Sequence, residues 1–156
     1  MKNNTQFVAK AGIIAALYIV LAMLSTALGI SSGPVQLRLS EMLSILAFFT
    51  PAAIPGLTLG CLISNVLSGC VIWDIIFGSI ATLLGAIGTW LLKKNRFLSL
   101  IPPILSNTII VPLILSYAYG IKTALPLLML SIFVSEFISA GILGHITYTI
   151  YKKINA

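Results

Sequence analysis

Long apolar stretches separated by short polar breaks organise the whole chain. Runs of about 20 residues or more cover residues 11–30, 73–92, 98–117 and 123–151, and each is long enough to cross roughly 30 Å of hydrocarbon. Two shorter runs, 41–50 and 57–68, lie on either side of the turn residues Pro51, Pro55 and Gly56. The short runs fit two tilted crossings or one re-entrant hairpin. We favour two crossings, which predicts an all-α integral membrane protein with six transmembrane helices.

The break between the runs 11–30 and 41–50 has a pattern of its own. Residues 31–34 are turn formers, and residues 35–40 then alternate between apolar and polar side chains. A period of two predicts an extended segment, with Ser40 capping the next helix and Glu41 in its first turn. We expect residues 31–40 to cover a site on this side of the membrane.

Basic residues set the expected orientation. With six crossings, Arg38 and Lys122 lie on one side of the membrane and the other seven Lys and Arg residues lie on the side of both termini. Cytoplasmic loops are enriched in Lys and Arg, so we expect both termini to be cytoplasmic. The basic residues occur in small groups between apolar runs, so the net charge of +6 does not indicate nucleic-acid binding.

Composition supports the membrane assignment. Hydrophobic residues make up 59% of the chain and charged residues 8%, against roughly 25% charged in soluble domains. The mean hydropathy is +1.12. We expect residues 1–156 to form a single transmembrane domain of a multi-pass protein.

The chain has only three acidic residues, Glu41, Asp74 and Glu136. A carboxylate in hydrocarbon is costly, so intramembrane acids usually face a cavity, a partner or a ligand. The orientation places Glu41 and Asp74 at outer helix ends and Glu136 near mid-membrane. Asn65 lies near the outer end of its run and Asn107 near the middle of its run, so the sequence predicts one polar pocket open to the outside.

Structural roles explain some of these residues as well as ligand binding does. Glu41 and Asp74 suit the positive N-terminal ends of their helices. Asn65 and Asn107 suit hydrogen bonds between helices. Arg38 lies three residues from Glu41, and a pair between them would belong to the covering segment. Glu136 is hardest to explain structurally, because it lies well inside its run with no basic residue near it in sequence.

Catalytic and metal-binding patterns are missing from the sequence. It contains no HExxH, no glycine-rich phosphate loop with lysine, and no suitable Ser, His and Asp set. Its two cysteines lack metal-ligand spacing. We expect no enzymatic activity, no metal and no cofactor in this chain; ATP, if transport uses it, would be hydrolysed by partners.

Four segments carry a family resemblance. They are 36–41 (QLRLSE), 53–56 (AIPG), 60–69 around Asn65, and 73–79 (WDIIFGS). Together they resemble the QueT-type queuosine-precursor transporters, which are substrate-binding S components of energy-coupling-factor (ECF) transporters. The resemblance covers nearly the whole chain and is densest over residues 36–94. It implies an S-component-like bundle in the bacterial cytoplasmic membrane.

The resemblance also implies a ligand and partners. The ligand would be a 7-deazaguanine captured from outside, such as queuine or its aminomethyl or cyano precursor. The partners would be the ECF transmembrane coupling subunit, docked at Ala11 and Ala15 of a small-xxx-small pair, and two ATPase subunits. A carboxylate suits the paired N–H donors of a guanine-like edge, and Trp73 or Tyr18 would stack on the base. The expected substrate-binding residues are Arg38, Glu41, Asn65, Trp73, Asp74, Asn107 and Glu136.

Two other functions stay open at this point. One is a stand-alone proton- or sodium-coupled carrier that uses Glu136 as the proton site. The other is an accessory membrane subunit whose acidic residues only brace helices.

Overall fold

A computed structural model describes residues 2–31 and 36–154 of the chain, with side chains described from residue 4 onward. Its described part consists of helices and short connections. The elements are α1 (Lys2–Ala27), the 3₁₀ helix η1 (Leu39–Phe48), α2 (Ala53–Leu67), α3 (Ile72–Leu91), the short 3₁₀ helix η2 (Leu98–Leu100), α4 (Ile101–Tyr117), α5 (Leu125–Glu136), the π-helical segment η3 (Phe137–Leu143) and α6 (Gly144–Ile154).

All six predicted apolar runs are helical in the structure, but they differ in length. Four segments are long and apolar enough to cross a membrane: 4–27, 72–91, 98–117 and 125–154. The helices η1 and α2 are shorter, with 10 and 15 residues. At rises of about 2.0 Å and 1.5 Å per residue they extend roughly 20 Å. Four full-length spans and two shorter apolar helices therefore make up the bundle.

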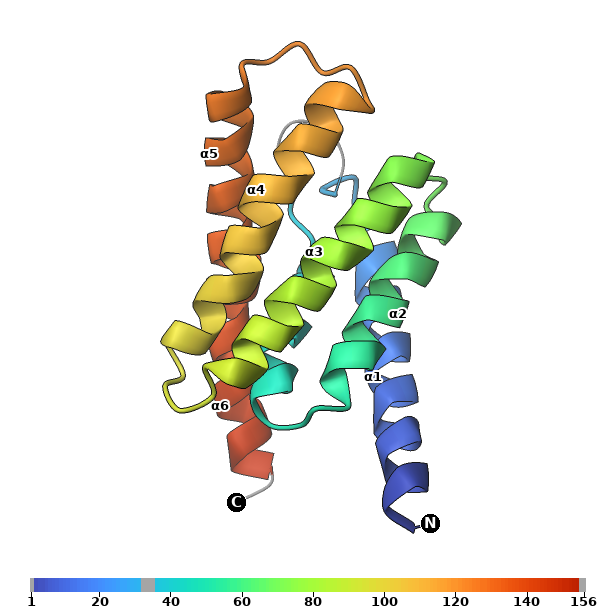
Figure 1. Cartoon of the computed structure of the whole chain (residues 1–156), viewed down its shortest axis with the longest axis vertical. Helices are drawn as coiled ribbons and strands as arrows, with labels where there is room; N and C mark the ends of the chain where they lie inside the picture. The colour runs from blue at the N-terminus through green and yellow to red at the C-terminus, as the bar shows by residue number, and fades with distance from the viewer. Residues whose placement is uncertain (1, 32–35, 155–156) are drawn as a thin grey trace.

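The path of the chain distinguishes two crossings from a shallow hairpin. The positions of the Lys and Arg residues do not distinguish these alternatives. Two crossings and a hairpin both return the chain to the membrane face at which η1 begins. In Figure 1 the turn between η1 and α2 lies at about the level of the turn between α3 and α4, near the end of the molecule that carries both termini. The chain therefore runs toward that end through η1 and returns through α2, as two antiparallel segments that are each shorter than the four long spans.

Glycine allows α1 and α2 to pack closely. Gly56 and Gly60 are four residues apart on one face of α2. A Cβ on Gly56 would lie 2.7 Å from the carbonyl oxygen of Ala11, and one on Gly60 would lie 2.7 Å from the Cβ of Tyr18. The Ala15 carbonyl oxygen is also close to Gly60. Ala11 and Ala15 are thus half-buried against α2.

The opposite face of α1 is open. Gly12 and Ala16 are exposed, and Val8, Ile13 and Val20 are among the many apolar side chains that point outward. Only 11% of the apolar window in α1 is buried inside the chain. An apolar surface of this extent suits contact with lipid or with another membrane subunit.

The segment before η1 is extended, as its alternating pattern predicts. Arg38 has φ −102° and ψ 103°, and the Leu37 N–H donates to the Ile30 carbonyl at 2.7 Å. Residues 32–35, part of the expected cover, lie outside the described residues. The predicted Ser40 cap is wrong: η1 begins after Arg38 without a side-chain cap, and the Ser40 hydroxyl is buried without a hydrogen-bond partner among the described residues.

Candidate functional site

A polar cavity of about 270 Å³ opens at the end of the bundle opposite the termini. It lies among the last turns of α1, α2 and α4, the first turn of α3 and the extended segment before η1. Gln36 and Arg38 both line it, because alternate residues of an extended segment point to the same side, and Ser40 at the start of η1 lines it as well. We call this space the outer cavity, after the side of the membrane on which the sequence predicts it. Its other polar lining residues are Tyr18, Thr26, Ser31, Ser64, Asn65, Ser68, Cys70, Asp74 and Tyr119.

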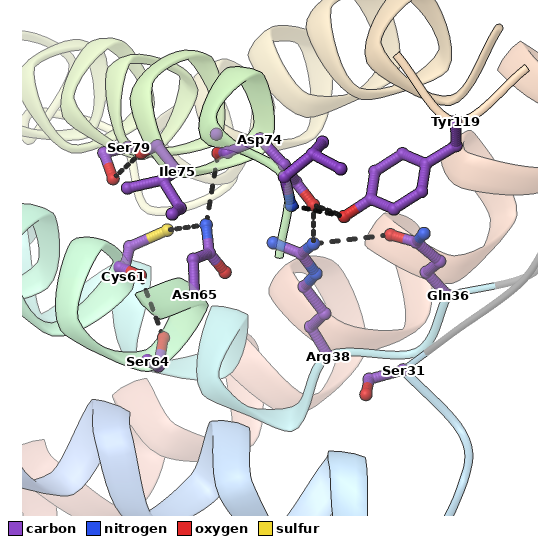
Figure 2. Close-up of polar contacts among 12 residues, drawn as sticks. Ser31, Gln36, Arg38, Cys61, Ser64, Asn65, Asp74, Ile75, Ser79 and Tyr119 are labelled. Atoms are coloured by element: carbon purple, nitrogen blue, oxygen red, sulfur yellow. Dashed lines mark hydrogen bonds and ion pairs between the residues drawn. The ribbon is translucent and has the colours of Figure 1, made fainter. Parts of the chain in front are cut away.

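Arg38 and Asp74 form the charged centre of the outer cavity (Figure 2). The Arg38 Nη2 lies 3.7 Å from the Asp74 Oδ2 and 3.5 Å from the Gln36 Oε1. Burial lowers the pKa of Arg38, but the carboxylate of Asp74 and other nearby groups more than offset this, so the guanidinium stays charged. The first turn of α3 is a favourable place for the Asp74 carboxylate, because the N-terminal end of a helix is positive.

Tyr119 adds a third group to this centre. Its hydroxyl donates to the Asp74 Oδ2 at 3.0 Å and accepts the Val71 N–H at 3.4 Å. Burial and the neighbouring Asp74 carboxylate raise the pKa of Tyr119, so its hydroxyl keeps its proton and acts as a donor. The second carboxylate oxygen of Asp74, Oδ1, is buried and has no hydrogen-bond partner among the described residues.

Asn65 presents an acceptor beside this carboxylate. Its Nδ2 donates to the backbone carbonyl of Asp74 at 3.3 Å and contacts the Cys61 Sγ at 3.7 Å. These contacts fix the amide, so that its oxygen points to the side of Arg38 (Figure 2). Asn65 thus connects α2 to α3 and keeps an oxygen available to a ligand.

A second polar layer lies behind the outer cavity. The Tyr18 hydroxyl donates to the Glu41 Oε1, and the Ser44 hydroxyl donates to the Glu41 Oε2 at 3.1 Å. Tyr18 lines the outer cavity, whereas Glu41 is 2% exposed and does not. Tyr18 therefore separates the cavity from this carboxylate.

Glu136 and Asn107 belong to the same inner layer. Both are buried, and Glu136 interacts electrostatically with Asn107, Glu41 and Arg38. The Glu136 Oε2 has no hydrogen-bond partner among the described residues. A π-helical segment begins directly after Glu136, a form that is rare and is often found at functional sites.

The structure thus divides the predicted site residues into three groups. Arg38, Asn65 and Asp74 line the outer cavity, while Glu41, Asn107 and Glu136 lie behind it. Trp73 lies elsewhere: its side chain is 56% exposed and lines an apolar groove with Phe77, whose ring centre is 6.0 Å away. The position of Trp73 does not support its expected stacking role, whereas Tyr18, the stated alternative, lies at the wall of the outer cavity.

Gln36 and Tyr119 are among the outer-cavity residues that were not predicted from the sequence. Gln36 shares the alternation of Arg38 and Ser40, and this signal was sufficient to find it. Tyr119 was expected only as an interfacial aromatic, and no sequence pattern connects it to Asp74. The possible pair of Arg38 with Glu41 is replaced by the pair with Asp74, because the extended backbone turns Arg38 toward α3.

Comparison with known proteins places this geometry in a family. A sequence profile described as QueT transporter matches residues 8–153. The chain belongs to the QueT transporter family. This confirms the family resemblance seen in the sequence, and the four helices long enough to cross a membrane fit a multi-pass membrane protein.

One curated relative of this QueT-family chain is the protein named "Queuosine precursor transporter QueT" of Lactococcus lactis subsp. cremoris (strain MG1363). The two are 44% identical over 82 residues, which is 53% of this chain and 48% of the relative. The chain thus spans about half the length of that relative in the match. No solved structure matches the QueT-family chain.

Proposed function

We propose that this chain captures a queuosine precursor, a 7-deazaguanine, from outside the bacterial cytoplasmic membrane. The family assignment and the name of the Lactococcus relative support this ligand class. The observation that carries the proposal is the cavity of about 270 Å³, whose lining brings Arg38, Asn65 and Asp74 together. A cavity near the lower end of the usual ligand-pocket range suits a single fused-ring base.

The outer cavity matches the chemistry of such a base. A guanine-like edge carries adjacent N–H donors, which the Asp74 carboxylate and the Asn65 oxygen accept. The base also carries a ring carbonyl, for which Arg38 and the amide of Gln36 supply donors. The aromatic ring of Tyr18 forms part of the cavity wall and stacks on the base. The inner acids Glu41 and Glu136, with Asn107, brace this arrangement from behind.

Calorimetry on the purified protein tests the capture function. We expect queuine, the aminomethyl precursor or the cyano precursor to release or absorb heat with one-to-one stoichiometry. Asp74→Asn weakens binding of the same ligand by about tenfold or more, because it removes a charge-assisted acceptor. Lys122→Gln, which changes one exposed charge outside the cavity, serves as the matched control. No heat with any of the three ligands, on a folded sample, rules out the capture function.

We further propose that the chain is the S component of an ECF importer. Its partners are a transmembrane coupling subunit, which docks on the small-residue face of α1, and two ATPases that use the ATP. The exposed Gly12 and Ala16 extend the expected docking pair Ala11 and Ala15 onto the open side of α1. Vesicles that contain this chain alone should bind the ligand without transporting it, and uptake should require the partner subunits and ATP.

One observation favours a second candidate, an ion-coupled carrier that works alone. The Glu136 Oε2 is buried and has no partner among the described residues, as expected of a carboxyl group that takes up a proton. The same vesicles distinguish the two functions. Uptake that follows a proton or sodium gradient without ATPases supports the carrier and contradicts the ECF assignment.

A further inference from the structure

A groove of about 310 Å³ lies at the end of the bundle that carries both termini, away from the outer cavity (Figure 1). The helices α1 and α6 both pack on η1, and the groove runs between them over the surface of η1. We call it the terminal groove. Its apolar lining includes Ile13 and Leu17 of α1, Leu43 and Leu46 of η1, and Ile150 and Ile154 of α6.

The terminal groove is apolar and open. Leu43 and Leu46 are buried beneath it, whereas Ile13, Leu17 and Ile150 are exposed along its walls. Both walls belong to segments that are long and apolar enough to cross a membrane. A groove between two such helices is surrounded by lipid, so an acyl chain is the apolar occupant that is always at hand.

Positive charge lies beside this apolar lining. Lys10 lines the groove and is the only charged residue of the span 4–27. It forms no ion pair with a carboxylate among the described residues. Lys152 and Lys153 add two exposed charges in the last turn of α6. None of the three acidic side chains lines the groove, so the charge that complements it is an anion from outside the chain.

We propose that the terminal groove binds an anionic phospholipid, with an acyl chain along its apolar lining and the headgroup phosphate at Lys10. Basic groups at the ends of membrane helices attract acidic headgroups, and a pocket between helices holds them in place. A lysine near a helix end extends its apolar stem through the lipid and places its ammonium group at the headgroups. This site is separate from the outer cavity and does not depend on the ligand bound there.

The terminal groove uses a different side of α1 from the proposed docking face. Lys10, Ile13 and Leu17 follow the spacing i, i+3, i+7 and share one face of the helix. Gly12 and Ala16 are centred roughly a third of a turn away, since successive residues differ by about 100°. Lipid binding and docking of a coupling subunit are therefore distinguishable by substitution.

Native mass spectrometry of the purified full chain tests the lipid site. Dioleoyl phosphatidylglycerol and dioleoyl phosphatidylcholine are supplied at equal concentration, since they share acyl chains and differ in headgroup charge. We expect the chain to retain the anionic lipid about fivefold more than the zwitterionic one, as expected for one lysine at a headgroup. Equal retention of the two lipids overturns the inference.

A charge variant locates the headgroup. In Lys10→Gln we expect the preference for phosphatidylglycerol to fall by about threefold to fivefold. Lys122→Gln is the matched control, because it removes one exposed charge from the loop between α4 and α5. The preference should stay as in the wild type there. A preference that persists in Lys10→Gln, or that falls equally in both variants, overturns the assignment to this groove. If Lys10→Gln does not fold, the wild-type comparison still decides whether the chain selects an anionic lipid.

A filling variant tests the apolar part of the site. Ile13→Trp places a large ring in the groove, so we expect retention of both lipids to fall by about threefold or more. Leu130→Trp, at an exposed position on α5, is the control and should retain both lipids as the wild type does. If Ile13→Trp leaves lipid retention unchanged and instead abolishes assembly with a coupling subunit or with a second copy of the chain, the groove is a protein interface and the inference is overturned.

Discussion

The Arg38 guanidinium lies 3.7 Å from the Asp74 carboxylate and joins the extended segment before η1 to the first turn of α3. The two residues are 36 positions apart in the sequence. Both are largely buried, so the charge of each depends on the other. This ion pair closes one side of the outer cavity and brings the covering segment onto the helix that carries the proposed ligand-binding acid.

Removal of one member of this pair is expected to destabilise the protein. Arg38→Gln leaves the Asp74 carboxylate with Tyr119 as its remaining side-chain donor and should lower the free energy of unfolding by about 1–3 kcal/mol. The double variant Arg38→Gln/Asp74→Asn should lose less than the sum of the two single variants, with a coupling of about 0.5–3 kcal/mol. Thermal unfolding in detergent measures all three. Strict additivity contradicts a direct interaction.

A second prediction concerns the hydroxyl of Tyr18. Tyr18→Phe removes the donor to the Glu41 Oε1 and leaves only the Ser44 donor, so we expect a loss of about 1–3 kcal/mol in unfolding free energy. The control is Tyr148→Phe, whose ring packs against Phe48 and Phe49 at the other end of the bundle. It should change stability by less than about 0.5 kcal/mol. Equal effects of the two variants contradict a special role for the Tyr18 hydroxyl.

The third prediction tests the close packing of α1 on α2. Gly60→Ala places a methyl group 2.7 Å from the Tyr18 Cβ, so the helices must separate. Overpacking of this kind costs about 1–3 kcal/mol. Gly12→Ala is the matched control, because a Cβ there meets nothing within 4 Å. Alanine favours helix over glycine, so the control should be neutral or stabilising by up to about 1 kcal/mol. Differential scanning fluorimetry of the two variants shows whether the ranking holds.

The fourth prediction separates docking from ligand binding. Ala16 is exposed on the small-residue face of α1, whereas Ala11 and Ala15 are half-buried against α2. We expect Ala16→Trp to abolish ATP-dependent uptake by the assembled importer while the ligand affinity of the isolated chain changes by less than about twofold. Leu130→Trp, at an exposed position on α5, is the control and should retain uptake. Loss of ligand binding in Ala16→Trp contradicts a docking role.

Local patterns in the sequence predicted much of this structure. Runs of apolar residues predicted each helix, because a helix in lipid must satisfy its own backbone and expose apolar side chains. The alternation over residues 35–40 predicted the extended segment, and Arg38 confirms it. The rarity of acids in so apolar a chain was enough to identify Asp74 as a lining residue of the cavity.

Other features depend on contacts between distant residues, and local patterns do not contain them. The hydrogen bond between Tyr119 and Asp74 exists because the end of α4 meets the start of α3, and neither sequence neighbourhood indicates it. Trp73 turns outward although Asp74, the next residue, turns inward, since adjacent residues on a helix differ in direction by about 100°. The 3₁₀ form of η1 and the π-helical segment after Glu136 were likewise not predicted from local patterns.

The sequence by itself determined a helical membrane protein with three interior carboxylates, because hydrophobicity and charge are properties of each residue wherever it lies. Only the tertiary structure decided how these carboxylates are divided. Helix packing places Asp74 at the cavity with Arg38 and Tyr119, and it places Glu41 and Glu136 behind Tyr18. The physical reason is that access to a ligand depends on which helix faces meet, and that is fixed by close contacts such as those of Gly56 and Gly60 with α1.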